Sequence, residues 1–160
     1  MKSRQSKAAR FALSCVVVIA VGGSGDVPAA ALETSLTIPI SGTVDGGAES
    51  VSLSGSLRIV STVVADTTLA TPKGRLVITL VGVSGVGLVS GAKYVATGED
   101  RLLRQLSVSD HIDVLFPFYR ISAGPGSARS GMASITLTFD LIAQSLKGAT
   151  GTFGSPKLPR

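Results

Sequence analysis

Apolar and polar residues alternate along most of the chain, and alternation with a period of two is typical of a half-buried β-strand. The longest alternating segment is 49–64, where Ser, Arg and Thr separate the apolar residues. Those apolar residues are Val51, Leu53, Leu57, Ile59 and Val63. The same pattern predicts shorter strands at 36–40, 92–97, 102–108, 112–119, 133–141 and 146–153. Only 102–106 leaves a helical turn open.

The segment 76–83 differs from the other predicted strands because it is apolar on both faces. Leu76, Ile78 and Leu80 share one face, and valines occupy the other face at positions 77, 81 and 83. Strands that lack a polar face are typically buried on both sides. We therefore expect 76–83 to be a central strand that is covered, at least in part, on both faces.

Clusters of Gly, Pro, Asp and Glu separate these segments and predict turns. They lie at 45–47, 65–74, 98–100 and 123–127. Seven to nine strands joined by short turns, without a helix of useful length, predict an all-β fold. We expect an antiparallel two-sheet sandwich, and a closed or partly closed β-barrel is the alternative.

The N-terminal segment has the order of a secretory signal peptide. Four basic residues in 1–10 precede the apolar run 11–21, and small residues end the segment at 29–31. The run is too short to cross a bilayer as a helix, which needs about 20 residues. We predict cleavage after Ala31, with an uncleaved anchor as the alternative. Cys15 precedes most of the apolar run, so lipidation is not expected.

The predicted domains are the signal peptide 1–31, one β domain at 32–154 and a flexible tail at 155–160. The predicted location is secreted, periplasmic or at the cell surface.

Removal of the signal peptide changes what the charge implies. The whole chain carries 15 basic and 10 acidic residues, and 11 basic and 9 acidic residues remain after residue 31. The remaining basic residues are scattered, so we expect no nucleic-acid partner. The only cysteine leaves with the signal peptide, so the mature domain has no disulfide or thiolate metal site. Seven aromatic residues and no tryptophan argue against an outer-membrane barrel.

The glycine-rich stretch Gly82–Gly98, GVSGVGLVSGAKYVATG, raises the question of a phosphate-binding loop. Within it, Gly85-Val86-Gly87 begins like the dinucleotide motif G-x-G-x-x-G, but Ser90 stands where that motif has its third glycine. The residues that follow predict a strand rather than the helix that the motif requires. The sequence thus predicts no nucleotide cofactor. Instead, we expect four structural glycines that permit a bulge, a turn or close strand approach: Gly82, Gly85, Gly87 and Gly91. We expect Gly85 or Gly87 to hold a conformation that a side chain would oppose.

The only histidine is followed two residues later by a carboxylate. On a strand, His111 and Asp113 share one face, opposite Ile112 and Val114, and that face is expected to meet solvent. One imidazole and a carboxylate make an incomplete metal site. No G-x-S-x-G elbow accompanies the histidine. The sequence thus predicts no catalytic, metal or cofactor residues, and it leaves an enzymatic activity open while favouring none.

Aromatic residues near the end of the predicted strand 112–119 suggest a weak binding surface. Phe116 and Phe118 share the buried face of that strand, which leaves Tyr94 and Tyr119 as exposed candidates for ligand contact, together with His111. Asp113 is the fourth such candidate. The glutamates at 33, 49 and 99 fall at loops or termini, and nothing in the sequence pairs them.

The residues at 82–97 and 116–126 are similar to a group of small secreted bacterial β-sandwich proteins of uncharacterised activity. The shared features are a stretch G-x-[ST]-G-x-G-x-x-[ST]-G-x-x-Y, then F-x-F-Y-R-I-S and a G-P-G turn, over most of the mature chain. This resemblance implies an exported β domain and supplies no catalytic residues. The seven residues GATGTFG at 148–154 also resemble the GGTG-x-F of dirigent and allene oxide cyclase-like barrels.

Two functional hypotheses follow from these patterns. The first is an exported, non-enzymatic β-sandwich that acts in binding or surface interaction. Its partners would be a protein, a glycan or a second copy through an edge strand, and it would meet the membrane only transiently through the signal peptide. The alternative is a small-molecule-binding or isomerase-like β-barrel, related to the dirigent and allene oxide cyclase-like folds.

Overall fold

The computed structural model describes residues 32–64 and 72–156 of the chain. The predicted signal peptide with its cleavage site and Cys15 lies outside these described residues. So do residues 65–71 of the predicted connection and residues 157–160 of the predicted tail.

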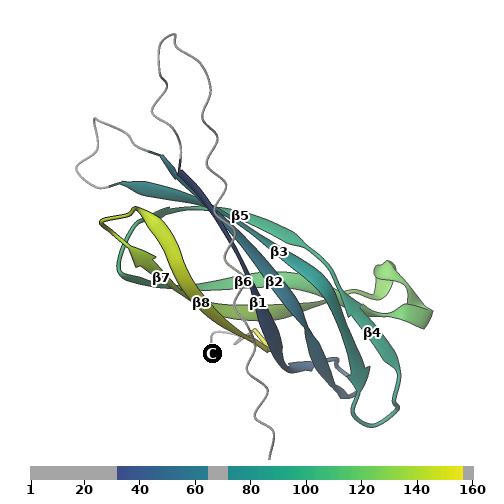
Figure 1. The fold of residues 1–160 in the computed structure, drawn as a ribbon. Coiled ribbons are helices and arrows are strands. Elements are labelled where there is room, and N and C mark those ends of the chain that lie inside the picture. The colour runs from purple at the N-terminus through teal and green to yellow at the C-terminus, as the bar shows by residue number, and fades with distance from the viewer. Residues whose placement is uncertain (1–31, 65–71, 157–160) are drawn as a thin grey trace, which may run out of the picture.

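Eight strands make up most of the described chain, which confirms the all-β class (Figure 1). They are β1 (Leu32–Asp45), β2 (Ser50–Val64), β3 (Lys73–Gly87), β4 (Lys93–Ala96), β5 (Glu99–Gln105), β6 (Ser109–Arg120), β7 (Arg129–Asp140) and β8 (Ser145–Gly154). Two single 3-10 turns follow β6, at Ile121–Ala123 and Pro125–Ser127. The segment 102–106 is not helical, since β5 extends through Gln105.

The strands form a closed barrel, so the prediction of a two-sheet sandwich is wrong and its barrel alternative holds. Hydrogen-bonded neighbours run β2-β1-β8-β7-β6-β4-β3, and β3 pairs again with β2. Seven strands close this ring, and β5 is an extra strand that pairs with β3 alone. Alternation specifies only an inner and an outer face of each strand, and both architectures satisfy it.

One contact between β1 and β8 completes the ring, and it is the only parallel pairing among the described strands. Its backbone register covers only Ser41 with Thr152 and Gly42 with Phe153. Every other pairing is antiparallel. The predicted antiparallel arrangement is thus correct everywhere except at this closing contact.

The inner face of the barrel carries apolar side chains from all eight strands and from the turn after β5. Phe116 and Phe118 lie inside, as their parity predicts, at 3% and 1% exposure. The large side chains with the least exposure also include Leu53, Leu57, Ile59, Leu76, Ile78, Ile135 and Leu137. The alternation in 49–64 and 133–139 thus predicts the buried face correctly, whereas Leu141, expected on the same face, lies after the end of β7 and is 45% exposed.

The predicted central strand 76–83 changes face at a bulge. Val81 faces solvent at 45% exposure, whereas Val83 is buried at 2%. Between them Gly82 adopts a φ of 60°, and the register of β3 with β2 shifts beside Gly55. An extra residue in the left-handed conformation inverts the side-chain parity of a strand. The expectation that both faces are covered is therefore wrong at Val81.

The barrel has two ends with different loops (Figure 1). At one end, here called the rim, lie the turns 46–49 and 88–92 and the loop 121–128. The opposite end carries the turns 106–108 and 141–144. No helix in the described ranges has the length and apolar character needed to cross a bilayer.

Candidate functional site

The barrel wall has a lateral opening between β5 and the first half of β6. Strand β4 pairs with β6 at Ala96 and Phe118, but β5 has no backbone register with β6 although only three residues connect them. A hollow of about 450 Å³ occupies this place. Its lining consists of Leu103, Arg104, Gln105, Leu106, Ser107 and Asp110. This lateral opening is the largest of the hollows described here.

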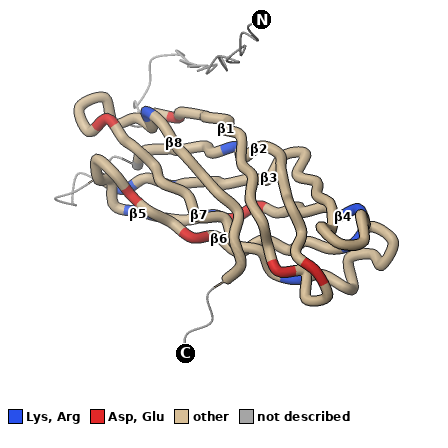
Figure 2. The backbone as a smooth tube through the Cα atoms, turned by 90° about the horizontal axis from the view of Figure 1, so that it is seen from below, with Lys and Arg blue, Asp and Glu red and all other residues tan. Residues whose placement is uncertain are grey.

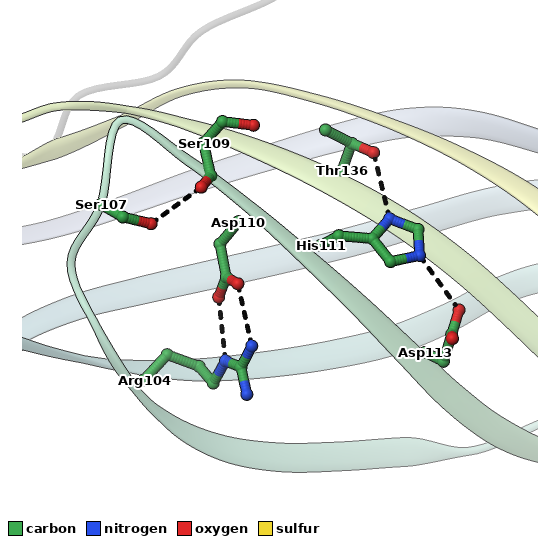
Figure 3. A network of polar contacts seen from close by, with 7 residues as sticks. All are labelled: Arg104, Ser107, Ser109, Asp110, His111, Asp113 and Thr136. Carbon is green, nitrogen blue, oxygen red and sulfur yellow. Dashed lines mark hydrogen bonds and ion pairs between the residues drawn. The ribbon is translucent and has the colours of Figure 1, made fainter.

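A bidentate ion pair spans the lateral opening (Figure 3). Arg104 donates from Nε and Nη2 to the two carboxylate oxygens of Asp110, over 2.9 and 2.8 Å. The hydrogen bond from Arg104 lowers the pKa of the Asp110 carboxyl, and the same bond raises the pKa of Arg104. Two parallel hydrogen bonds fix both distance and orientation. The pair therefore joins β5 to the start of β6 where no backbone pairing does.

Behind the lateral opening lies a buried hydroxyl without a partner. Ser61 is fully buried on the inner face of β2, and its Oγ has no hydrogen-bond partner among the described residues. A Cβ placed on Gly74 would lie 2.9 Å from Leu106 Cδ2 and 3.8 Å from this oxygen. Leu106, which lines the opening and is 6% exposed, and the Ser61 hydroxyl are thus both close neighbours of Gly74.

The histidine cluster lies on the outer face of β6, close to the lateral opening (Figure 3). His111 Nε2 is 3.4 Å from Asp113 Oδ1, and its Nδ1 is 3.3 Å from Thr136 Oγ1. Ser134 donates to the same Asp113 oxygen, over 2.6 Å. The serine thus bonds to the carboxylate rather than to the imidazole, so this is not the order of a nucleophile–base–acid triad. Within 32–64 and 72–156, no three His, Cys, Asp or Glu residues group as metal ligands.

The two candidate tyrosines lie near the rim on opposite faces of the paired strands β4 and β6, and the prediction that they are exposed is wrong. Both are half-buried, and both line a hollow of about 150 Å³ together with Arg120 and Arg129. Tyr94 shares the inward parity of the buried Ala96, and its ring centroid is 6.3 Å from that of Phe118. It therefore covers the core at this end. His111 and Asp113 lie elsewhere on β6 and do not join the tyrosines.

The turn 88–92 binds a carboxylate that belongs to the chain itself. Glu49 accepts hydrogen bonds from the backbone N–H groups of Val89 and Ser90, from Ser90 Oγ and from the Tyr94 hydroxyl. These bonds, with that from the Ser90 side chain first, lower the pKa of Glu49 to about 2. Two adjacent N–H groups that converge on one anion form a small nest. The glycine-rich stretch thus does hold an anion, and Glu49 supplies it.

The four structural glycines serve two different geometries. Gly82 and Gly91 have φ of 60° and 68°, in the left-handed region. Gly85 and Gly87 have no such φ, but a Cβ on Gly85 would meet Leu53 and Ser52, and one on Gly87 would overlap the Glu49 carboxylate. The close approach of these neighbouring atoms explains why positions 85 and 87 are occupied by glycine.

Sequence reasoning missed Glu49 and the ion pair across the lateral opening. Glu49 is 41 residues from Ser90, and only the pairing of β2 with β3 brings them together. One signal was present: a turn with free N–H groups requires an acceptor, and Glu49 is an acidic residue beside a predicted turn.

We expect the Glu49 contact to make stability depend on pH in an acidic window. Its folded pKa of about 2 lies below the ordinary 4.5, so its contribution is complete above about pH 4.5 and is lost as pH falls toward 2. Glu49→Gln should remove this contribution. Urea unfolding midpoints from pH 7 to pH 2.5 should therefore converge for the wild type and the variant.

Asp110 and Asp140 also have lowered pKa values, so the wild type minus variant difference isolates Glu49. A constant difference across that pH range would contradict the assignment.

Comparison with family models, with curated proteins and with solved structures finds no match to this chain.

Proposed function

We propose that this protein is a small-molecule-binding β-barrel that takes a largely apolar ligand through the lateral opening. The ligand would carry one polar group, placed against Ser61, and an apolar body that displaces Leu106. This proposal refines the barrel alternative among the functions expected from the sequence. It includes export from the cytoplasm, as the N-terminal segment predicts.

The unpartnered hydroxyl of Ser61 carries the proposal. Most buried polar side chains have a hydrogen-bond partner, and one without a partner costs about 1–3 kcal/mol. A site that binds a ligand accounts for such a cost, because the ligand supplies the missing partner. The surrounding inner wall is apolar, and apolar walls with few polar groups are typical of small-molecule sites.

The lateral opening supplies a route to this hydroxyl. The wall there is held by the side chains of Arg104 and Asp110 rather than by a continuous backbone ladder. A side-chain contact separates at lower cost than paired strands, because no ladder of hydrogen bonds has to break. Leu106 lines the opening, and both Leu106 and Ser61 Oγ lie close to Gly74, so a ligand that displaced Leu106 would come near Ser61.

Probe binding tests this function. N-phenyl-1-naphthylamine, which fluoresces in apolar surroundings, should bind the wild type saturably and be displaced by 1-octanol. Ser61→Ala should stabilise the free protein by about 1 kcal/mol, since the unpaired hydroxyl is removed. The same change should weaken displacement by 1-octanol about fivefold, the equivalent of one lost hydrogen bond.

Two further variants change the space behind the lateral opening in opposite directions. Leu106→Ala should increase probe affinity, whereas Gly74→Val should fill the space and abolish binding. Val81→Ala, on the outer face of the same strand as Gly74, is the matched control and should leave binding unchanged. Unsaturable probe binding in both the wild type and Leu106→Ala would refute the proposal.

A further inference from the structure

We propose that the rim of the barrel docks on an anionic lipid surface. The surface consists of Leu88 and Val89 in the turn 88–92, Ile121 in the loop 121–128, and the cations Lys93 and Arg120. It lies apart from the lateral opening, so this inference does not depend on the proposed ligand. It also departs from the expectation that only the signal peptide meets a membrane.

Three apolar side chains project from the rim into solvent. Leu88, Val89 and Ile121 are 61%, 86% and 59% exposed. Single exposed apolar residues are common on soluble proteins. A pair at the tip of a turn with a third beside it is the pattern of an interaction surface.

The turn holds its apolar residues in this position rather than burying them. Glu49 accepts hydrogen bonds from the N–H groups of Val89 and Ser90, and Gly91 N–H donates to Gly87 O. These contacts fix the backbone on both sides of the tip. Val89 therefore cannot fold back onto the barrel without breaking them.

Two cations lie beside Ile121 and specify the charge of the partner. Lys93, Arg120 and Ile121 line one hollow of about 400 Å³ with Gly91, and Lys93 and Ile121 line a second of about 280 Å³. Neither Lys93 nor Arg120 forms an ion pair within the described part of the chain. In Figure 2, basic positions lie beside β4 at this end.

The acids at the rim are already bound to backbone. Besides Glu49, Asp45 accepts a hydrogen bond from Gly47 N–H, and within the described residues neither carboxylate forms an ion pair with Lys93 or Arg120. Protruding apolar residues that enter the interface, flanked by cations that meet lipid phosphates, are the combination that peripheral membrane binding requires.

The opposite end of the barrel provides a built-in comparison. Ile142 in the turn 141–144 is 99% exposed, and Asp140 accepts hydrogen bonds from the N–H groups of Ile142 and Ala143. This turn resembles the rim turn in exposure and in its carboxylate brace, and Lys147 is near enough to Asp140 to lower the pKa of that carboxyl. At the rim, two cations line one hollow together with an exposed apolar residue, Ile121.

Vesicle co-sedimentation tests the inference. The full chain and its variants are mixed with vesicles of phosphatidylcholine alone or of equal parts phosphatidylcholine and phosphatidylglycerol. Val89→Asp should lower binding to the anionic vesicles at least tenfold, because it places a charge at the inserting position. Arg120→Ala should lower it about fivefold, the usual effect of one cation at such a surface.

Ile142→Asp is the matched control, since it makes the same kind of change at the other end, and binding should not change. All variants share residues 1–31, so their differences report the rim alone. Equal loss with Val89→Asp and Ile142→Asp would overturn the inference. Binding to heparin that needs Arg120 but not Val89, without the predicted loss on vesicles, would instead identify a polyanion site and also overturn it.

Discussion

Gly42→Ala is expected to open the barrel and to lower its stability by about 3 kcal/mol. Gly42 lies in the two-residue register that joins β1 to β8, and a Cβ there would overlap the carbonyl oxygen of Phe153. The obstacle is backbone rather than the end of a flexible side chain, so the two strands must separate. At about 4 °C for each kcal/mol, the melting temperature should fall by roughly 10 °C.

Thermal unfolding and amide hydrogen exchange together check this prediction. Exchange should accelerate in β8 more than in β3, because β3 keeps its long pairing with β2. Gly148→Ala is the matched control on β8 itself, since a Cβ at Gly148 has open space around it. An unchanged melting temperature for Gly42→Ala would show that barrel closure does not depend on this close approach.

The remaining contacts between β1 and β8 limit how far Gly42→Ala can destabilise the protein. Asp45 N–H donates to Ser155 Oγ over 2.7 Å, and Leu146 N–H donates to Thr34 Oγ1 over 3.2 Å. They lie on either side of the Gly42 register. We therefore expect a weakened seam in a protein that still folds, rather than an unfolded chain.

Phe118→Ala should destabilise the protein by about 3–5 kcal/mol, which is the usual cost of a large cavity in a core. Phe118 is 1% exposed, and the ring of Tyr94 packs toward it at the rim. The cavity would remove support from Tyr94, and Tyr94 donates to Glu49. Loss of stability should thus come with weaker order in the turn 88–92.

Urea unfolding measures the first effect, and hydrogen exchange at Val89 and Ser90 measures the second. Leu115→Ala, on the same strand but 60% exposed on the outer face, should change stability by only about 0.5 kcal/mol. If both variants lose similar stability, the inner and outer faces of β6 are assigned wrongly.

Much of the fold could be predicted because the alternation of apolar and polar residues shows which side chains of a strand share a face. Phe116 and Phe118 share a parity in the sequence and share the core in the structure. Prediction was wrong where a local change of geometry broke the parity. Gly82 inverts the facing of Val83, and glycine permits this conformation without requiring it.

The candidate sites could be predicted far less well, because their residues meet only through long-range pairing. Tyr94 and Tyr119 line the same rim hollow because β4 pairs with β6, and the sequence placed them only as separate candidates. Ser61 shares the parity of Leu57, Ile59 and Val63, so alternation alone places it on the inner face. Only the structure shows that its buried hydroxyl has no partner.

The glycine-rich stretch 82–98 illustrates what could be predicted from the sequence and what could not. From the sequence alone, the missing third glycine and the strand after it argued against a nucleotide. The structure adds that the N–H groups of this turn bind a carboxylate from 41 residues away. No local pattern records that partner, since strand register decides it.

The all-β class, the position of most strands and the choice of side chains that face the core follow from local sequence patterns, because each depends on residues that are close neighbours in the chain. Tertiary structure alone decided that the strands close into a barrel, that β5 and β6 leave a lateral opening, and that Glu49 meets the turn 88–92. The physical reason is that closure depends on which strand edges meet in space. That choice rests on a few close contacts, such as Gly42 with Phe153, whose residues are far apart in the sequence.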